Sequence, residues 1–257
     1  MLAFFRSLWV WFAASLLVIM WLPLLAVIRL FDRDPVHYRT GRWFRRVGVM
    51  MTKIVPTWRF HVAGAETVTD PRRPYVVVSN HQSFADIPII SRLPWEMKWV
   101  AKLSVFKVPV GGWMMRLAGD IPVQRDSHLS RGGVLPRARW YLDRHCSVMF
   151  FPEGTRSLGG RVRRFHDGAF RLAIEAQTPI LPIALDGTMN CLPKHSWILR
   201  GIIDIRLQVL PPVETAGLTV DDLDSLRDRV RGAIMNQVAA WRGANVTEVD
   251  GTQEMKG

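Results

Sequence analysis

Short apolar runs that each end in a polar turn recur along the middle of this chain. Tyr75 to Val78, Ser147 to Phe151 and Ile180 to Leu185 have the length and apolar character of buried strands. Stretches with a helical pattern, such as Gly132 to Arg144 and Gly168 to Ala176, lie between them. Because strands that alternate with helices usually form a parallel sheet covered by those helices, the sequence predicts an α/β fold with a mostly parallel sheet flanked by helices.

Further segments extend this predicted sheet and add a C-terminal helix. The additional strand candidates are Trp58 to Val62, which alternates like an edge strand, Met97 to Ala101, Asp120 to Val123 and Ile203 to Val209. Thr219 and Asp222 fit a capping box that opens a helix. Apolar residues from Leu223 to Trp241 recur at helical spacing, so we expect this helix to pack on the core.

The first apolar run leads directly into Asn80-His81-Gln82-Ser83-Phe84-Ala85-Asp86, across a predicted strand-to-helix turn. If the turn brings the Asp86 carboxylate to Nδ1 of His81, Nε2 is left free to take a proton from a substrate hydroxyl. Asp86 also has a structural interpretation, as the N-cap of the next helix with Ser83 completing a capping box. The pattern alone leaves both interpretations open.

The second apolar run ends in Phe151-Pro152-Glu153-Gly154-Thr155-Arg156-Ser157. The carboxyl ends of parallel strands converge on one crevice of a sheet. We therefore expect Glu153, Thr155 and Arg156 to share a site with His81 and Asp86.

These two segments resemble the hallmark motifs N-H-x4-D and F-P-E-G-T-R-S of the 1-acyl-glycerol-3-phosphate acyltransferase (lysophosphatidate acyltransferase) family, within the glycerolipid acyltransferase superfamily. Two weaker blocks occur in the family's order, so the resemblance covers roughly residues 60 to 190. They are Lys102, Pro109, Gly112, Gly119, Ile121 and Arg125 in one block, and Thr178 to Ile183 in the other. The chain departs from the family pattern at two places. It has Leu103-Ser104 where the family often has Lys-Glu, and His166-Asp167 where the family often has lysine-rich residues. These departures bear on which headgroup the substrate carries and not on the type of reaction.

The resemblance implies a membrane-bound enzyme of phospholipid biosynthesis that moves a fatty acyl group from an acyl thioester to the 2-hydroxyl of lysophosphatidate. It implies that His81 is the general base and that Asp86 orients the imidazole. Lys102, Arg125 and Arg156 would bind the acceptor phosphate, and Glu153 would orient the site. The Thr155 hydroxyl would either bind the glycerol part or stabilise the turn, and amides near Gly154 would stabilise the oxyanion. No metal or other cofactor is expected; the co-substrate is acyl-CoA or acyl-carrier protein.

Other functions remain open at this point. The same chemistry could act on another lyso-lipid, such as a lyso-ornithine lipid, because the His-Asp pair does not read the headgroup. A non-catalytic lipid-binding membrane protein is a second alternative, which the intact His81 and Asp86 disfavour. A serine hydrolase is disfavoured because no Gly-x-Ser-x-Gly motif occurs.

Charge and tryptophan content point to an anionic membrane surface. Lysine and arginine total 34 against 22 acidic residues, giving a formal net charge of +12, which favours an anionic partner. No nucleic-acid motif is present, whereas 11 tryptophans favour a lipid interface, so we expect anionic lipid and no nucleic acid as partner. Cys146 and Cys191 lack the spacing of metal ligands or of a disulfide framework.

The N-terminal segment is the expected membrane anchor. Ser7 to Ile28 is uncharged and apolar, long enough to cross a bilayer or to lie within one leaflet. Apolar residues from Trp43 to Ile54, interspersed with Arg42, Arg45, Arg46 and Lys53, predict a second, amphipathic helix at the interface, which is similar to the family's two-helix membrane motif.

The predicted organisation has three parts. Residues 1–57 form the membrane-associating helices, residues 58–242 the acyltransferase α/β domain, and residues 243–257 a disordered tail. The expected location is a membrane with the active site on the cytoplasmic side, the inner membrane if the source is bacterial.

Overall fold

The computed structural model describes residues 2–124, 130–157, 159–191, 197–199 and 201–252. Its helices are α1 (Leu2–Phe31), α2 (Tyr38–Ile54), α3 (Asp86–Ile90), α4 (Gly111–Ala118), α5 (Ser130–Leu142), α6 (Gly168–Ala176), α7 (Leu223–Arg242) and α8 (Val246–Val249). Its strands are β1 (Trp58–Ala63), β2 (Val76–Ser79), β3 (Met97–Lys102), β4 (Ile121–Val123), β5 (Ser147–Phe150), β6 (Ile180–Asp186) and β7 (Ile203–Val209). Short 3₁₀ turns are η1 (Ala65–Thr67), η2 (Val105–Lys107), η3 (Thr188–Asn190) and η4 (Val220–Asp222).

The strands form one sheet in the order β1-β7-β6-β2-β5-β3-β4. Neighbouring strands are parallel except β6 and β7, which are antiparallel, so the predicted mostly parallel sheet is confirmed. Each strand begins and ends within one residue of its predicted range, and β1 lies at an edge as its alternating sequence indicated.

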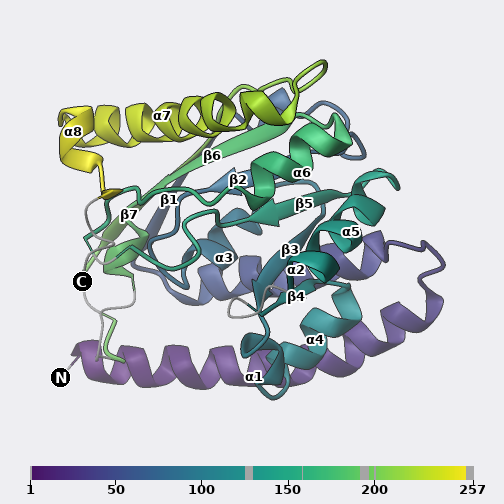
Figure 1. The fold of residues 1–257 in the computed structure, drawn as a ribbon. Coiled ribbons are helices and arrows are strands. Elements are labelled where there is room, and N and C mark those ends of the chain that lie inside the picture. Colours follow the sequence, from purple (N-terminus) through teal and green to yellow (C-terminus); the bar gives the residue numbers. More distant parts are fainter. Residues whose placement is uncertain (1, 125–129, 158, 192–196, 200, 253–257) are drawn as a thin grey trace.

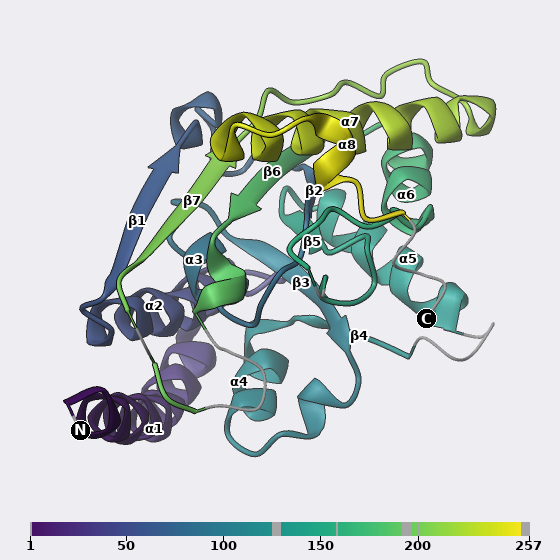
Figure 2. The same cartoon turned by 90° about the vertical axis from the view of Figure 1, so that its left-hand side faces the viewer.

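Helices cover both faces of the sheet. Val76 and Val78 of β2 pack into an apolar cluster with residues of α5, α6 and α7, whereas Val77 packs on the opposite face with residues of α3. Figures 1 and 2 show α5, α6 and α7 over one face and α2, α3 and α4 over the other. The central strands are continuous apolar runs because a strand buried on both faces has no solvated side.

Helix α1 lies along one side of the domain, at the bottom of Figure 1. Among the described residues it is the one helix long and apolar enough to cross a membrane. Its N-terminal half is tied to the segment before β7, because the Leu199 amide donates to Ser7 Oγ at 2.8 Å and Arg6 donates to the Leu199 carbonyl at 2.7 Å. Its C-terminal half contacts α2, where the Trp21 indole donates to the Trp43 carbonyl at 3.0 Å.

Helix α2 includes the predicted segment from Arg42 to Ile54 but begins earlier, at Tyr38, and part of its basic face points into the domain. Arg42 donates to the carbonyls of Leu93 and Trp95 at 2.8 and 2.9 Å, and Arg45 is only 5% exposed. The other basic residues, Arg46 and Lys53, are exposed. The helix thus binds the domain through two of the side chains that its sequence suggested for a membrane interface.

The C-terminal tail, expected to be disordered from residue 243, is folded as far as residue 252. A capping box between Asn245 and Glu248 opens α8, and Val249 is buried. Arg231 of α7 also binds Asp250 at 2.6 Å. The prediction was wrong for these residues because it read polar side chains as solvated, whereas they bind one another and α7. Residues 253–257 lie outside the described residues.

Candidate active site

The sheet topology brings the predicted site residues to one edge. Strands β2, β5 and β3 are parallel neighbours, so their carboxyl ends lie side by side. His81 follows β2, Glu153 to Arg156 follow β5, and Lys102 is the last residue of β3. Arg125, predicted to bind phosphate, lies outside the described residues just after β4.

His81 and Asp86 form the pair that the turn was predicted to create. Nδ1 of His81 lies 2.7 Å from Oδ2 of Asp86, with the His81 side chain 13% exposed and that of Asp86 fully buried. Among the described residues, none forms a hydrogen bond with Nε2 of His81. The imidazole therefore has one nitrogen bound to a buried carboxylate and the other available at the site.

The same Asp86 oxygen also holds the turn together. Oδ2 accepts the amide hydrogens of Gln82 and Ser83 at 2.7 and 3.0 Å. Asp86 is not the N-cap of the next helix, because α3 begins at Asp86 itself. Ser83 does not complete a capping box either: its Oγ accepts a hydrogen bond from the Ala85 amide at 3.3 Å. One carboxylate thus orients the imidazole and stabilises the turn that carries it.

Asn80 fixes the turn to the neighbouring strand β6. Its side-chain amide donates to the Leu185 carbonyl and accepts from the Leu185 amide, both at 2.9 Å. This pair of bonds imitates a backbone partner and continues the β2–β6 ladder past Ser79. Asn80 had no predicted role, although an amide side chain directly before the histidine was the available signal.

Glu153 joins the two motif loops. Its Oε1 accepts the His81 amide at 2.8 Å and its Oε2 accepts the Arg163 amide at 3.2 Å. The residue is 4% exposed, and burial raises the pKa of its carboxyl to about 8 against the opposing effect of those two amides. With both oxygens bound to backbone, Glu153 is placed to hold the His81 loop and not to contact a substrate directly.

Phe151 packs against the imidazole, a contact the sequence reading missed. The rings of His81 and Phe151 are stacked with centroids 4.0 Å apart and planes 18° from parallel. The signal was an aromatic residue at the end of β5, the strand that neighbours the one before His81. One face of the imidazole is therefore covered by an apolar ring.

Arg156 lies over the His81 turn without an acidic partner. Its guanidinium carbon lies 4.1 Å from the ring centroid of Phe84, and both residues are exposed. No acidic side chain among the described residues forms an ion pair with Arg156 or Lys102, and both are exposed at the same sheet edge. These cations are free to bind an anion. Thr155 is exposed beside them.

Amides near Gly154 were predicted to stabilise the oxyanion, but the Gly154 amide itself is not available. It donates to the Phe151 carbonyl at 3.0 Å and is therefore used by the turn. The amides of Thr155 and Arg156 form no hydrogen bond with a described residue, so they are the available donors. Gly154 has a φ of 71°, and a Cβ there would lie 3.1 Å from the His166 ring, which explains the glycine.

The cysteines are core residues. Cys146 and Cys191 are free and buried, and burial raises the pKa of each thiol to about 12. Neither is a nucleophile near neutral pH, because the thiolate is the reactive form. Among the residues described, no group of three His, Cys, Asp or Glu could hold a metal ion.

Similarity to known proteins covers most of the chain. The family model described as Acyltransferase matches residues 59–186. A chloroplastic 1-acyl-sn-glycerol-3-phosphate acyltransferase of Brassica napus is 32% identical over 203 residues, which is 78% of this chain and 58% of the relative. That of Chlamydomonas reinhardtii is 31% identical over 230 residues, 88% of this chain and 65% of the relative. The alpha form of Homo sapiens is 38% identical over 180 residues, 69% of this chain and 62% of the relative.

The chain thus spans about three fifths of the length of these curated relatives. Among solved structures, the 1-acyl-sn-glycerophosphate acyltransferase PlsC of Thermotoga maritima has the same fold, with a TM-score of 0.77 at 24% identity over 93% of this chain and 95% of that chain. From the family model and the curated relatives, the chain belongs to the acyltransferase family that includes the 1-acyl-sn-glycerol-3-phosphate acyltransferases.

Proposed function

We propose that this chain is a membrane-associated O-acyltransferase that moves a fatty acyl group from an acyl thioester to the 2-hydroxyl of lysophosphatidate, giving phosphatidate. The observation that carries the proposal is the 2.7 Å bond between His81 Nδ1 and Asp86 Oδ2, together with the Arg156 guanidinium over Phe84 of the same turn, which has no acidic partner among the described residues. A base and an anion-binding group in one turn suit an acceptor that carries both a hydroxyl and a phosphate. The printed names of the curated relatives support the same acceptor.

In the proposed reaction, Nε2 of His81 removes the proton of the 2-hydroxyl while the hydroxyl oxygen bonds to the thioester carbonyl carbon. The carbonyl electron pair moves to oxygen, and the Asp86 carboxylate stabilises the imidazolium. When the oxyanion collapses, the carbon–sulfur bond breaks and His81 returns its proton to the thiolate sulfur. The acyl group passes directly to the acceptor, with no acyl-enzyme.

The oxyanion is proposed to accept hydrogen bonds from the loop after β5. The amides of Thr155 and Arg156 are the candidates, because the Gly154 amide is used within the turn. Backbone donors that are already oriented stabilise a developing charge without reorganising. Arg156 and Lys102, together with Arg125, are proposed to bind the acceptor phosphate, and Thr155 the glycerol part.

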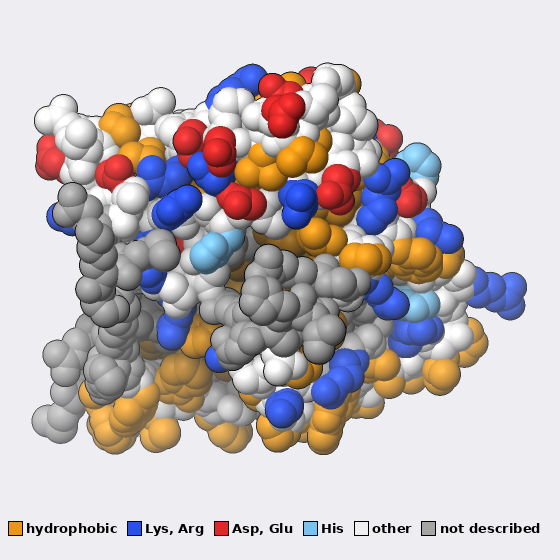
Figure 3. All heavy atoms as spheres, viewed as in Figure 1, with side chains coloured by type: hydrophobic (Ala, Val, Ile, Leu, Met, Phe, Trp, Pro, Cys, Tyr) orange, Lys and Arg blue, Asp and Glu red, His pale blue; other side chains and the backbone are white. Residues whose placement is uncertain are grey.

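Membrane association is proposed to rest on α1. Its outward side chains include Trp9, Phe12 and Ile19, which are 63%, 60% and 59% exposed. Figure 3 shows hydrophobic atoms along the lower edge where α1 lies, whereas acidic side chains gather near the top over α7. An apolar helix of this length favours the bilayer. The location proposed with it is a membrane with the active site on the cytoplasmic side.

The proposal is tested by giving the purified chain a panel of acceptors, lysophosphatidate, a lyso-ornithine lipid and other lysophospholipids, each with acyl-CoA and with acyl-carrier protein. Product is identified by mass. We expect phosphatidate from lysophosphatidate, and almost none from His81→Ala, whose melting temperature and vesicle binding should match the parent. Product from another acceptor alone would overturn the assignment of lysophosphatidate. Vesicle binding with no product from any pair would favour the non-catalytic alternative.

A further inference from the structure

The bond to Asp86 fixes one atom of the His81 ring but not the tilt of its plane. The direction in which Nε2 points depends on what packs against the ring face. That contact is Phe151, stacked at 4.0 Å, so the position of Phe151 sets the tilt of the imidazole. The residues that hold Phe151 in place therefore also influence the direction in which His81 Nε2 points.

Phe151 is held from behind by Trp99 of β3. The two rings meet edge to face, with centroids 6.0 Å apart and planes at 61°. Trp99 is 5% exposed, and its amide donates to Asp120 Oδ1 at 3.0 Å. The backbone of Trp99 is therefore held in place, and its buried indole packs against Phe151.

Arg45 of α2 packs over the Trp99 ring. Its guanidinium carbon lies 5.2 Å from the Trp99 ring centroid, and it donates to the Asp120 carboxylate and, at 3.2 Å, to the Met97 carbonyl. The contacts thus run without a gap from α2 through Trp99 and Phe151 to His81.

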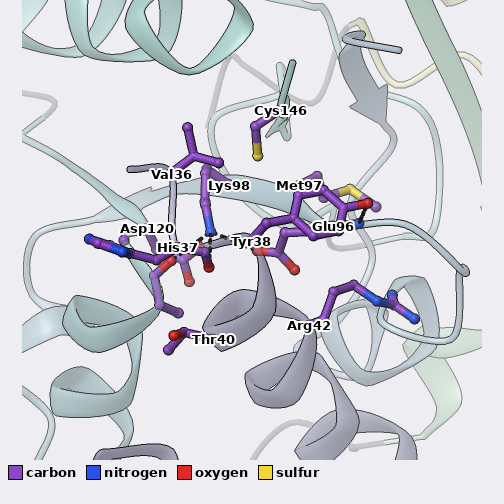
Figure 4. Close-up of polar contacts among 12 residues, drawn as sticks. Val36, His37, Tyr38, Thr40, Arg42, Glu96, Met97, Lys98, Asp120 and Cys146 are labelled. Atoms are coloured by element: carbon purple, nitrogen blue, oxygen red, sulfur yellow. Dashed lines mark hydrogen bonds and ion pairs between the residues drawn. The ribbon is translucent and has the colours of Figure 1, made fainter. Parts of the chain in front are cut away.

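Arg45 is itself fixed in what we call the buried charge cluster, formed by Arg45, Glu96, Lys98 and Asp120. Lys98 donates to Glu96 Oε1 at 3.1 Å and to the Ala118 carbonyl at 2.8 Å. Figure 4 shows Lys98 between Glu96, Asp120 and His37, the residue that precedes α2. Two basic and two acidic side chains meet in this cluster and all four are buried, and burial raises the pKa of the Glu96 carboxyl.

Gly41 lets α2 approach this cluster closely. A Cβ at Gly41 would lie 1.9 Å from Glu96 Oε1 and 2.7 Å from Lys98 Nζ. The helix therefore rests directly on the Glu96–Lys98 pair. Its position relative to β3 is fixed by both polar contact and close approach.

We infer that Trp99 and Phe151 are positioning residues for His81, and that Arg45 anchors them to α2, the helix that packs on the apolar helix α1. The inference rests on the proposed function, in which His81 is the base. It assigns to the buried side of α2 a role in setting the geometry of catalysis, in addition to any contact with lipid.

The test compares two buried tryptophans of the same apolar cluster. Trp99→Leu is the test variant, and Trp99→Phe is its conservative partner. Trp95→Leu is the matched control, because Trp95 is 2% exposed and, among the described residues, has no ring contact with Phe151 or Arg45. All are assayed with lysophosphatidate and acyl-CoA at a temperature well below every melting point. We expect kcat of Trp99→Leu to fall about tenfold to a hundredfold with KM for both substrates unchanged, partial recovery in Trp99→Phe, and parental kcat in Trp95→Leu.

A second measurement is independent of turnover. The His81 ring signals in an NMR spectrum, identified by their loss in His81→Gln, should broaden or shift in Trp99→Leu and Phe151→Leu and stay in place in Trp95→Leu.

The double variant Trp99→Leu with Phe151→Leu should lose little more kcat than the worse single variant, because the two residues act in series. Equal kcat losses in Trp99→Leu and Trp95→Leu, or unmoved His81 signals, would overturn the inference. A parent without acyltransferase activity would overturn the proposed function instead, while the NMR comparison would still test the packing claim.

Discussion

Replacing Asp86 with Asn separates the two tasks of that carboxylate. Oδ2 accepts from His81 Nδ1, Gln82 N and Ser83 N, whereas Oδ1 is buried with no hydrogen-bond partner among the described residues. An asparagine would keep its carbonyl oxygen at the Oδ2 position, because the NH₂ group would face three donors there. The imidazole tautomer and the turn should therefore survive the change, and only the negative charge is lost.

The two consequences differ in size. The new NH₂ group would take the buried, unpartnered Oδ1 position, which costs about 1 to 3 kcal/mol of stability. Loss of the charge removes an attraction to the imidazolium of about 4 kcal/mol for charges roughly 4 Å apart at an effective dielectric constant near 20. That corresponds to a fall in kcat of about 10³-fold.

The assay is kcat at saturating lysophosphatidate and acyl-CoA, together with thermal unfolding of the same preparations. Asp86→Ala is the contrast, since it leaves the Gln82 and Ser83 amides without an acceptor and should cost about 2 to 6 kcal/mol of stability, more than Asp86→Asn. An Asp86→Asn enzyme with close to parental kcat and a lowered melting temperature would show that Asp86 only caps the turn, and would refute the charge argument.

Three further outcomes are expected. Arg156→Ala should raise KM for lysophosphatidate about tenfold to a hundredfold and leave KM for the thioester unchanged, because a charge-assisted contact worth about 1.5 to 3 kcal/mol is lost; Arg144→Ala is the matched control, an exposed arginine 4.2 Å over Trp140 before β5. Equal KM changes for both substrates would contradict this role. Changing Trp9, Phe12 and Ile19 together to Asp should reduce flotation with vesicles more than a hundredfold without lowering the melting temperature. The control, with the exposed residues Val62, Val220 and Val246 changed to Asp, should float like the parent. Unaltered flotation of the first variant would place the anchor elsewhere. Because the Glu153 pKa is raised from 4.5 to about 8, the native state keeps a proton that the unfolded chain releases, so stability should fall by about 1.4 kcal/mol per unit as pH rises through that window, and denaturant unfolding of Glu153→Gln should not show this slope.

The sequence predicted the strands well because their signal is local. A run such as Tyr75 to Val78 is apolar at every position, and only burial on both faces of a sheet accommodates that. The His81–Asp86 contact was also within reach of prediction, because the two residues share one turn.

The contacts that the sequence did not predict join distant segments. His81 and Phe151 follow different strands, β2 and β5, and the stack between them depends on those strands being neighbours. Arg45 was read as one of several interfacial cations because its helix is amphipathic, yet its partners Asp120 and Trp99 lie on two other elements. The tail after residue 243 was misread for the same reason, since its polar residues bind α7.

The buried charge cluster is better understood as a device for orientation than for stability. Burying four ionisable side chains carries a large desolvation cost, and apolar residues of similar volume can stabilise a core as well or better. Apolar contacts are non-directional, however, whereas the polar contacts of Arg45 require specific partner atoms. The bonds of Arg45 to Asp120 and to the Met97 carbonyl are satisfied in one rotation, which also directs Trp43 toward Trp21 of α1. The cluster thus selects which face of α2 meets the apolar helix α1 and which meets Trp99 and, through it, Phe151 and His81.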